Sequence, residues 1–193
     1  MPRATLSEID ATARKAMRGF GCPWGMAEEA GRTARWLAAH GLPGAETVAV
    51  FLTARAGCCA GTGHPCDLAR AASLADRAGT ETTVLHGIDH PLLVLGQIGL
   101  AADALDRCFR LEWAGGEATV GPRALVREDG NRDDAHVTCI PVSTMKGGDR
   151  PSPASRDIAP EAWQTLRTFA DRTLVPASET SRAGAGAGVR DND

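Results

Sequence analysis

The sequence predicts an α+β fold, and three observations lead to it. Apolar residues recur at helical spacing through most of residues 1–107. Beyond residue 107, short segments alternate apolar and polar residues in the manner of strands. No strand–helix–strand alternation occurs and no GxGxxG follows a predicted strand, which argues against a dinucleotide-binding fold. We expect one domain over 1–193: a mainly helical part (1–107), a part with a small antiparallel sheet and one more helix (108–175), and a Gly/Ala-rich C-terminal segment (176–193).

The first half of the chain predicts five helices and one short strand. Thr5 and Glu8 have the spacing of a capping box, and the first helix then carries its apolar face on four residues, Ile9, Ala13, Ala16 and Met17. Pro23 opens the second helix and Gly41 ends it. Further helices are predicted over 46–54, over 68–77 with Asp67 as the cap, and over 92–105, with a strand at 82–85.

The second half of the chain predicts strands and a final helix. Residues 108–113 and 117–121 form the two arms of a β-hairpin around Ala114-Gly115-Gly116. Another strand covers 134–143, and a Gly-, Pro- and Ser-rich loop covers 146–155. The last helix begins at Pro160 and buries one side, made by Trp163, Leu166, Phe169 and Ala170.

Composition and charge argue against several classes of function. The formal net charge is −3 and no basic cluster stands out, so we expect no nucleic-acid partner. No stretch approaches the roughly 20 apolar residues of a membrane helix, and the first ten residues lack the apolar run of a signal peptide. We therefore expect a cytoplasmic protein with no membrane contact, whose six cysteines are reduced.

Two groups of residues have the chemistry of metal ligands but not the usual spacing. Cys58, Cys59, His64 and Cys66 lie within nine residues, yet the pattern is not a CxxC knuckle and has no second ligand pair. Small buried cysteines explain the same pattern, and the sequence leaves both interpretations open. His86 and His90 are interrupted by Gly87 and do not form a helical metal motif. A turn explains the pattern, and an acid or base role at neutral pH is the alternative. We expect no metal and no cofactor.

Two carboxylates near the start of the second helix are the candidate catalytic residues. Glu28 and Glu29 follow Trp24, and a carboxylate beside an indole can have a raised pKa and serve as a general acid or base. Acidic residues in the first turns of a helix also complement the helix dipole, which is the more ordinary explanation.

Two Ser–Arg pairs flank the last helix and predict an anion-binding site. Ser155-Arg156 and Ser181-Arg182 each combine a hydroxyl with a guanidinium, which binds carboxylates or phosphates through two hydrogen bonds. The alternating Gly/Ala run at 184–188 could line such a site with backbone N–H groups. Surface solvation is the ordinary alternative for an exposed arginine. The predicted substrate-binding residues are Trp24, Arg156, Ser178, Ser181, Arg182 and Asp191.

Both ends of the chain resemble one protein family. The segments LSEIDATARKAMRGFGCPWGMAEEAGRTARWLAAHGLPG and VPASETSRAGAGAGVRDND resemble the two ends of an uncharacterised family of bacterial proteins. The resemblance implies unknown function, so no catalytic residue is carried over from it. It draws attention to Trp24, Gly25, Glu28 and Glu29, and to Ser181, Arg182, Gly184 and residues 191–193.

Two hypotheses from different classes follow. In the first, the protein is an enzyme or enzyme subunit acting on a small polar, anionic metabolite, with the C-terminal segment lining the site. In the second, it is a non-catalytic partner or assembly subunit whose C-terminal segment docks on another chain. Under either hypothesis we expect a homo-oligomer, most simply a homodimer, and the second adds a further protein subunit as partner.

Overall fold

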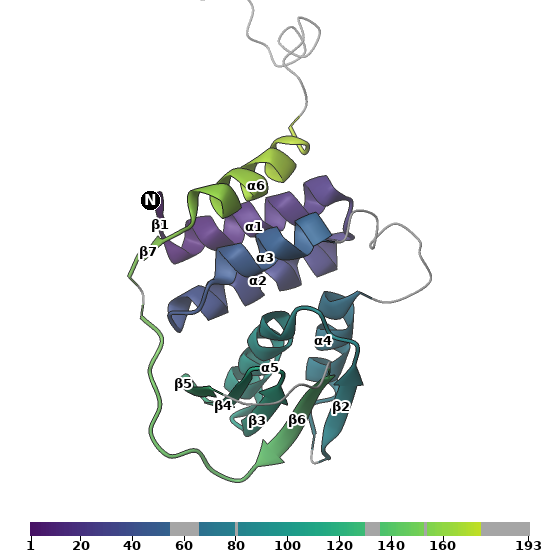
Figure 1. The fold of residues 1–193 in the computed structure, drawn as a ribbon, viewed down its shortest axis with the longest axis vertical. Helices are drawn as coiled ribbons and strands as arrows, with labels where there is room; N and C mark the ends of the chain where they lie inside the picture. Colours follow the sequence, from purple (N-terminus) through teal and green to yellow (C-terminus); the bar gives the residue numbers. More distant parts are fainter. Residues whose placement is uncertain (55–65, 80, 130–135, 153, 175–193) are drawn as a thin grey trace, which may run out of the picture.

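The structure, a computed structural model, describes residues 1–54, 66–79, 81–129, 136–152 and 154–174 (Figure 1). The helices within these residues are α1 (Leu6–Phe20), α2 (Trp24–Ala39), α3 (Gly44–Ala54), α4 (Asp67–Asp76), α5 (Pro91–Leu105) and α6 (Pro160–Asp171). The strands are β1 (Arg3–Ala4), β2 (Thr83–His86), β3 (Cys108–Trp113), β4 (Gly116–Gly121), β5 (Ala124–Asp129), β6 (His136–Val142) and β7 (Arg156–Asp157). The predicted α+β class is confirmed. No helix of the described residues combines the length and apolarity needed to cross a bilayer.

Four helices form one layer of the molecule. Figure 1 shows α1, α2 and α3 packed together, with α6 returning from the far end of the chain to cover α1. Glycines allow the close crossings. A β-carbon at Gly31 would lie 2.6 Å from Asp10 Oδ1, one at Gly44 would lie 2.0 Å from the carbonyl oxygen of Ala34, and one at Gly19 would lie 1.8 Å from that of Phe169. Helix α1 thus meets α2 at Gly31 and α6 at Gly19, while α2 meets α3 at Gly44.

A five-stranded antiparallel sheet forms the opposite side of the molecule. Its order is β2-β6-β3-β4-β5, so β6 lies between β2 and β3. Strand β3 alternates strictly, with Phe109, Leu111 and Trp113 buried and Arg110 and Glu112 on the other face. The two-residue strands β1 and β7 pair separately and join the start of the chain to the segment before α6.

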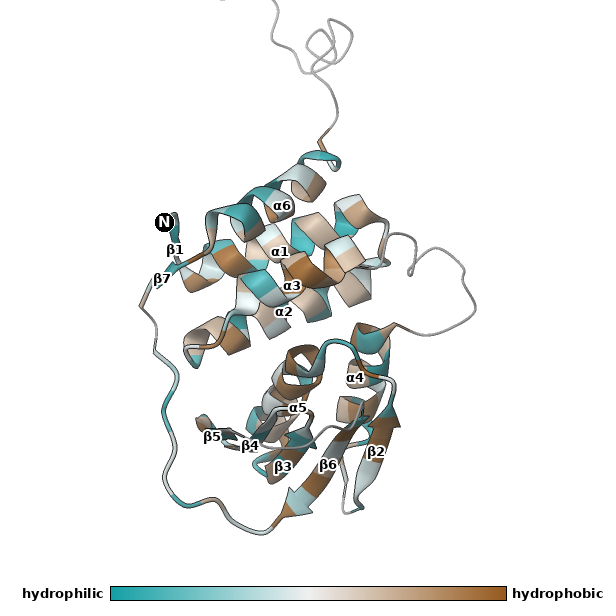
Figure 2. Cartoon of the chain, in the orientation of Figure 1, coloured by the Kyte–Doolittle hydropathy of each residue, from teal (hydrophilic) through white to brown (hydrophobic). Residues whose placement is uncertain are grey.

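Helix α5 lies between the helical layer and the sheet, together with α4. It is largely hydrophobic all round (Figure 2), which is the pattern of a helix buried on several sides. Helix α2 packs against it, and Trp36 and Leu37 belong to the same apolar cluster as the sheet, whereas Ala30 and Ala34 belong to that of the helical layer. Helix α2 therefore connects the two halves of the core.

Several predicted boundaries and roles differ from the structure. Helix α4 begins at Asp67, and the carboxylate of Asp67 does not cap this helix. Instead its Oδ2 accepts hydrogen bonds from the backbone N–H groups of Asp89 and His90, 3.0 Å each, immediately before α5. Strand β5 was not predicted, because half of its residues are charged and its apolar alternation is short.

Candidate functional site

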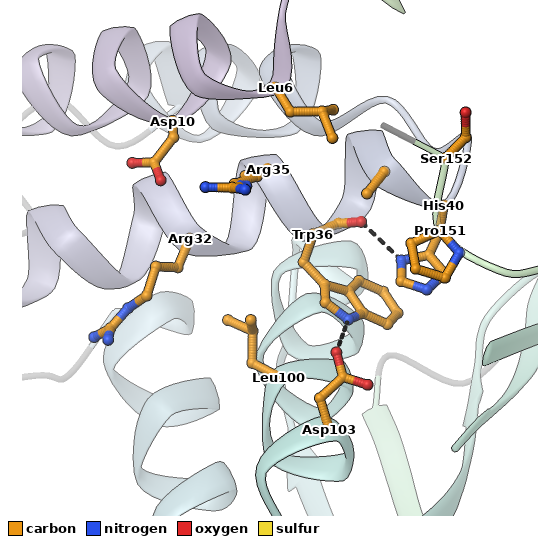
Figure 3. Close-up of a pocket in the computed structure, with 11 residues that line it drawn as sticks. Leu6, Asp10, Arg32, Arg35, Trp36, His40, Leu100, Asp103, Pro151 and Ser152 are labelled. Carbon is orange, nitrogen blue, oxygen red and sulfur yellow. Dashed lines mark hydrogen bonds between the residues drawn. The ribbon is translucent and has the colours of Figure 1, made fainter. Parts of the chain in front are cut away.

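A pocket of about 460 Å³ opens where α1, α2 and α5 meet the segment 151–152 (Figure 3). Small-molecule sites commonly have volumes of roughly 300–1,000 Å³. We call it the Trp36 pocket. It combines apolar side chains with two arginines, two aspartates and a histidine; its lining residues are Leu6, Asp10, Arg32, Arg35, Trp36, Ala39, His40, Leu100, Asp103, Pro151 and Ser152.

Close packing and a hydrogen bond hold the indole of Trp36 in place. It is only 5% exposed, and Gly99 on α5 provides the room, because a β-carbon there would lie 2.2 Å from Trp36 Cζ2. Its Nε1 donates to Asp103 Oδ2 at 3.1 Å, and Asp103 Oδ1 accepts from the backbone N–H of Arg123 at 2.6 Å. The Asp103 carboxylate thereby connects α2, α5 and the turn before β5. Trp36 is a rigid wall rather than an adaptable one.

His40 stacks on Trp36 at the C-terminal end of α2. The ring centroids are 4.0 Å apart and the planes differ by 32°. His40 Nδ1 lies 2.9 Å from the carbonyl oxygen of Trp36. Since a carbonyl only accepts, Nδ1 carries the hydrogen of this bond. Nε2 is buried and has no hydrogen-bond partner among the described residues.

Two arginines one turn apart on α2 give the pocket its positive charge. Arg32 pairs with the carboxylate of Glu29. Arg35 is exposed and makes no ion pair or side-chain hydrogen bond with any described residue. Figure 3 shows both guanidinium groups beside the pocket, on the side away from Pro151. Arg35 is therefore the cation that remains available to a ligand.

A carboxylate from α1 faces these arginines. Asp10 is half-buried and lies over Gly31 of α2, and its carboxylate forms no ion pair or hydrogen bond with a described residue. Gly31 and Arg35 are separated by one helical turn and so lie on the same face of α2. The crossing of α1 over α2 thus brings Asp10 to the same side of the pocket as Arg35.

The predicted catalytic residues, Glu28 and Glu29, lie on α2 before its pocket-lining residues, which begin one turn further along the helix at Arg32. Glu28 accepts a hydrogen bond at Oε1 from Trp24 Nε1 at 2.9 Å, and the Trp24 side chain is largely exposed. Glu29 uses both oxygens: Oε1 pairs with Arg32, and Oε2 accepts from Gln97 Nε2 at 3.2 Å. Glu29 therefore reaches the Trp36 pocket only through Arg32. Their catalytic role stays a prediction.

Arg156, predicted to bind substrate, lies at the opposite end of α2. Its Nε donates to the carbonyl of Ala38 at 2.7 Å and its Nη2 to that of Ala39 at 3.2 Å. A cation on the last carbonyls of a helix satisfies unpaired acceptors and complements the dipole. Ten residues of helix, about 15 Å, separate Glu28 from Ala38. The structure does not bring Arg156 together with Glu28 or Glu29.

The remaining predicted residues fall partly outside the described chain. The C-terminal set, Ser178, Ser181, Arg182 and Asp191, lies outside it, as do Cys58, Cys59 and His64. Cys66 is described and buried. The His86 and His136 rings are 5.8 Å apart across β2 and β6, and His90 packs against Phe51 with ring centroids 5.5 Å apart. The two histidines noted in the sequence thus lie in separate environments.

The sequence patterns do not predict the Trp36 pocket. Trp36 and His40 are four residues apart and therefore share a helix face, which was a visible signal. The other walls come from α1, α5 and residues 151–152, which are remote in the chain. Nothing local in the sequence indicates that these segments meet.

The comparisons with known proteins agree with the predicted family resemblance. Residues 4–74 match a family model described as a protein of unknown function (DUF3726). This confirms the expected relation to an uncharacterised family over residues 4–74, and the resemblance of the C-terminal segment stays a prediction. Seven lining residues of the Trp36 pocket, from Leu6 to His40, lie within the matched segment. No curated protein and no solved structure matches the chain.

Proposed function

We propose that the protein binds a small anionic molecule in the Trp36 pocket, with the Arg35 guanidinium as the principal contact of the anion. One observation carries this proposal: Arg35 lines a pocket of ligand size and has no acidic partner among the described residues. A guanidinium binds a carboxylate or phosphate through two parallel hydrogen bonds, so an available arginine in a pocket suits such a group.

The other walls support a ligand that also has an apolar part. Leu100 lies beside the Trp36 indole, and Leu6 lines the pocket from α1. Sites for small molecules are typically apolar with a few placed polar groups that fix the orientation of the ligand. Arg32 adds a second positive charge nearby, although Glu29 partly neutralises it. The ligand is thus a small organic anion rather than a bare inorganic ion.

The wider role stays as the sequence predicts it. Binding an anionic metabolite is the first step of an enzyme or enzyme subunit acting on it. The predicted contribution of the C-terminal segment concerns residues outside the described chain. The binding site proposed here is built from α1, α2, α5 and residues 151–152.

A ligand screen on the full chain tests the proposal. Small carboxylates and phosphates are screened by thermal shift, and binders are measured by calorimetry. A ligand at one hundred times its Kd adds about 2.7 kcal/mol of stability, or roughly 5–10 °C in Tm for a chain of this size. Arg35→Gln is expected to weaken the affinity at least about tenfold, because a hydrogen bond to a charged group is lost.

A matched variant separates a specific effect from a general loss of charge. Arg167 on α6 is also exposed and does not line the pocket, so Arg167→Gln should leave affinity unchanged. Equal affinity in the wild type and Arg35→Gln for every binder would reject the assignment. A screen with no binder for a well-folded wild type would reject the proposed function itself.

A further inference from the structure

The Trp36 pocket holds two opposite charges that do not pair with each other. Asp10 and Arg35 both line it, yet no ion pair joins them and neither has a charged or hydrogen-bonding side-chain partner among the described residues. The other charged residues are engaged. Asp103 accepts from Trp36 Nε1 and from the Arg123 backbone N–H, and Arg32 pairs with Glu29. One anion and one cation are left for a ligand.

The crossing of α1 over α2 places the two groups on neighbouring turns. Asp10 Oδ1 lies over Gly31, where an added β-carbon would be 2.6 Å from it. Arg35 follows Gly31 by one turn on the same face, a rise of about 6 Å. Asp10 and Arg35 therefore reach the pocket from neighbouring points on two crossing helices. A ligand that contacts both needs its own two charges close together.

We propose that the ligand is a small zwitterion, an α-amino acid with an apolar side chain. This inference rests on the proposed function, because the α-carboxylate binds Arg35. The α-ammonium then donates to the Asp10 carboxylate, and the side chain lies against Trp36 and Leu100. In an α-amino acid a single carbon carries both charged groups, and Figure 3 shows the Asp10 carboxylate and the Arg35 guanidinium on the same side of the pocket. Each charge of the ligand meets an unpaired charge of opposite sign, so neither is left without a partner.

Discrimination follows from the cost of an unpaired charge. A carboxylic acid that lacks the amino group would satisfy Arg35 but leave Asp10 facing an apolar group. An amine that lacks the carboxylate would leave Arg35 unpaired. Sites built to pair a polar group reject analogues that lack it, because the site's own group loses its partner. The pocket should therefore prefer the amino acid over both analogues.

Two matched ligand series test this on the wild-type full chain by calorimetry. The first is L-leucine, 4-methylpentanoate and 3-methylbutylamine; the second is L-phenylalanine, 3-phenylpropanoate and 2-phenylethylamine. In at least one series the amino acid should bind about tenfold or more tightly than the acid. The amine should bind no more tightly than the acid.

Variants then assign the charges. Asp10→Asn keeps the shape of the side chain and should reduce the affinity for the amino acid to that for the acid, without weakening the acid. Asp171→Asn, an exposed aspartate on α6 outside the pocket, should change neither affinity. Arg35→Gln should weaken both ligands.

The outcomes separate this inference from the proposed function. If the wild type binds the acid as tightly as the amino acid in both series, the zwitterion proposal is wrong and anion binding stands. Unchanged selectivity in a folded Asp10→Asn also overturns it. If neither amino acid binds, the zwitterion proposal is wrong, and the screen of carboxylates and phosphates decides the proposed function separately. The wild-type comparison alone decides the matter should Asp10→Asn not fold.

Discussion

Cys139 shows how burial at a single position controls reactivity. It lies in β6 with its side chain in the sheet cluster, and burial raises the pKa of its thiol to about 12. This thiol is therefore protonated at neutral pH, and because the thiolate is the reactive form, it reacts slowly. We expect iodoacetamide at pH 8 to modify Cys108, which is half-buried, well before Cys139 in the folded protein. Peptide mass mapping checks this, with unfolded protein as the control in which both react.

The raised pKa of the Cys139 thiol also predicts how the stability of the protein changes with pH. Its ordinary pKa is 9.0 and its folded value is about 12, so between these values the unfolded chain loses a proton that the folded chain keeps. Stability contributed by this group is complete below pH 9 and declines as the pH rises towards 12. Cys139 reacting as fast as Cys108 in the native state would contradict both expectations.

Single residues could be predicted where the cause is local. Ile9, Ala13, Ala16 and Met17 were expected on the inner face of α1, and all four are buried. The roles of Asp67 and Asp10 could not be predicted, because their neighbours come from other segments. Asp67 accepts from backbone N–H groups immediately before α5, and Asp10 reaches the pocket only because α1 crosses α2 at Gly31.

At the scale of one element, the capping box of α1 is the clearest case of sequence specifying structure. The backbone N–H of Thr5 donates to Glu8 Oε2 at 2.7 Å, and the N–H of Glu8 donates to Thr5 Oγ1 at 3.2 Å. Hydrogen bonds from the Thr5 backbone and then its side chain lower the pKa of Glu8 below its ordinary 4.5. A lowered pKa means that the folded state favours the charged carboxylate.

We therefore expect Glu8→Gln to destabilise the protein at pH 7 and to do so less at pH 3. The contribution is present above the unfolded pKa of Glu8 and is lost as the pH falls through its lower folded value. Urea unfolding at both pH values measures it. Glu161 lies in the first turn of α6, where no side chain caps the helix, so Glu161→Gln is the control. An equal pH dependence in both variants would contradict the capping assignment.

Elements with strong local signals were predicted, and those that depend on partners were not. The hairpin of β3 and β4 and the helices α1, α2, α5 and α6 agree with the sequence patterns. Strands β1 and β7 have two residues each and exist only because they pair with each other. The insertion of β6 between β2 and β3 is a long-range pairing that no local pattern specifies.

At the scale of the whole molecule, the docking of α6 on α1 closes the helical layer. Leu166 is fully buried there, and the rings of Phe20 and Phe169 meet at 5.6 Å. The approach is so close at Gly19 that a β-carbon would lie 1.8 Å from a backbone oxygen of α6. Backbone cannot move aside as a flexible side chain can.

Gly19→Ala is therefore expected to destabilise the protein by about 1–3 kcal/mol, as overpacking typically does. Gly25 near the start of α2 has open space around it, because nothing lies within 4 Å of the position that an added β-carbon would take. Gly25→Ala should be neutral or stabilising by up to about 1 kcal/mol, because alanine is the better helix former. Urea unfolding of both variants measures the two changes in the free energy of unfolding. A Gly19→Ala protein as stable as Gly25→Ala would mean that α6 packs less closely than described.

The return of α6 also sets an order of events during synthesis. Helix α1 leaves the ribosome early, but the helix that covers its Gly19 side is about 140 residues further along the chain. At translation rates of roughly 5–20 residues per second, that interval lasts about 7–28 s. All strands of the sheet, and α5, have been synthesised before α6 begins. The helical layer is complete only once α6 has been synthesised. The nascent chain thus carries an uncovered apolar face on α1 for seconds, which is long enough for a chaperone to recognise it.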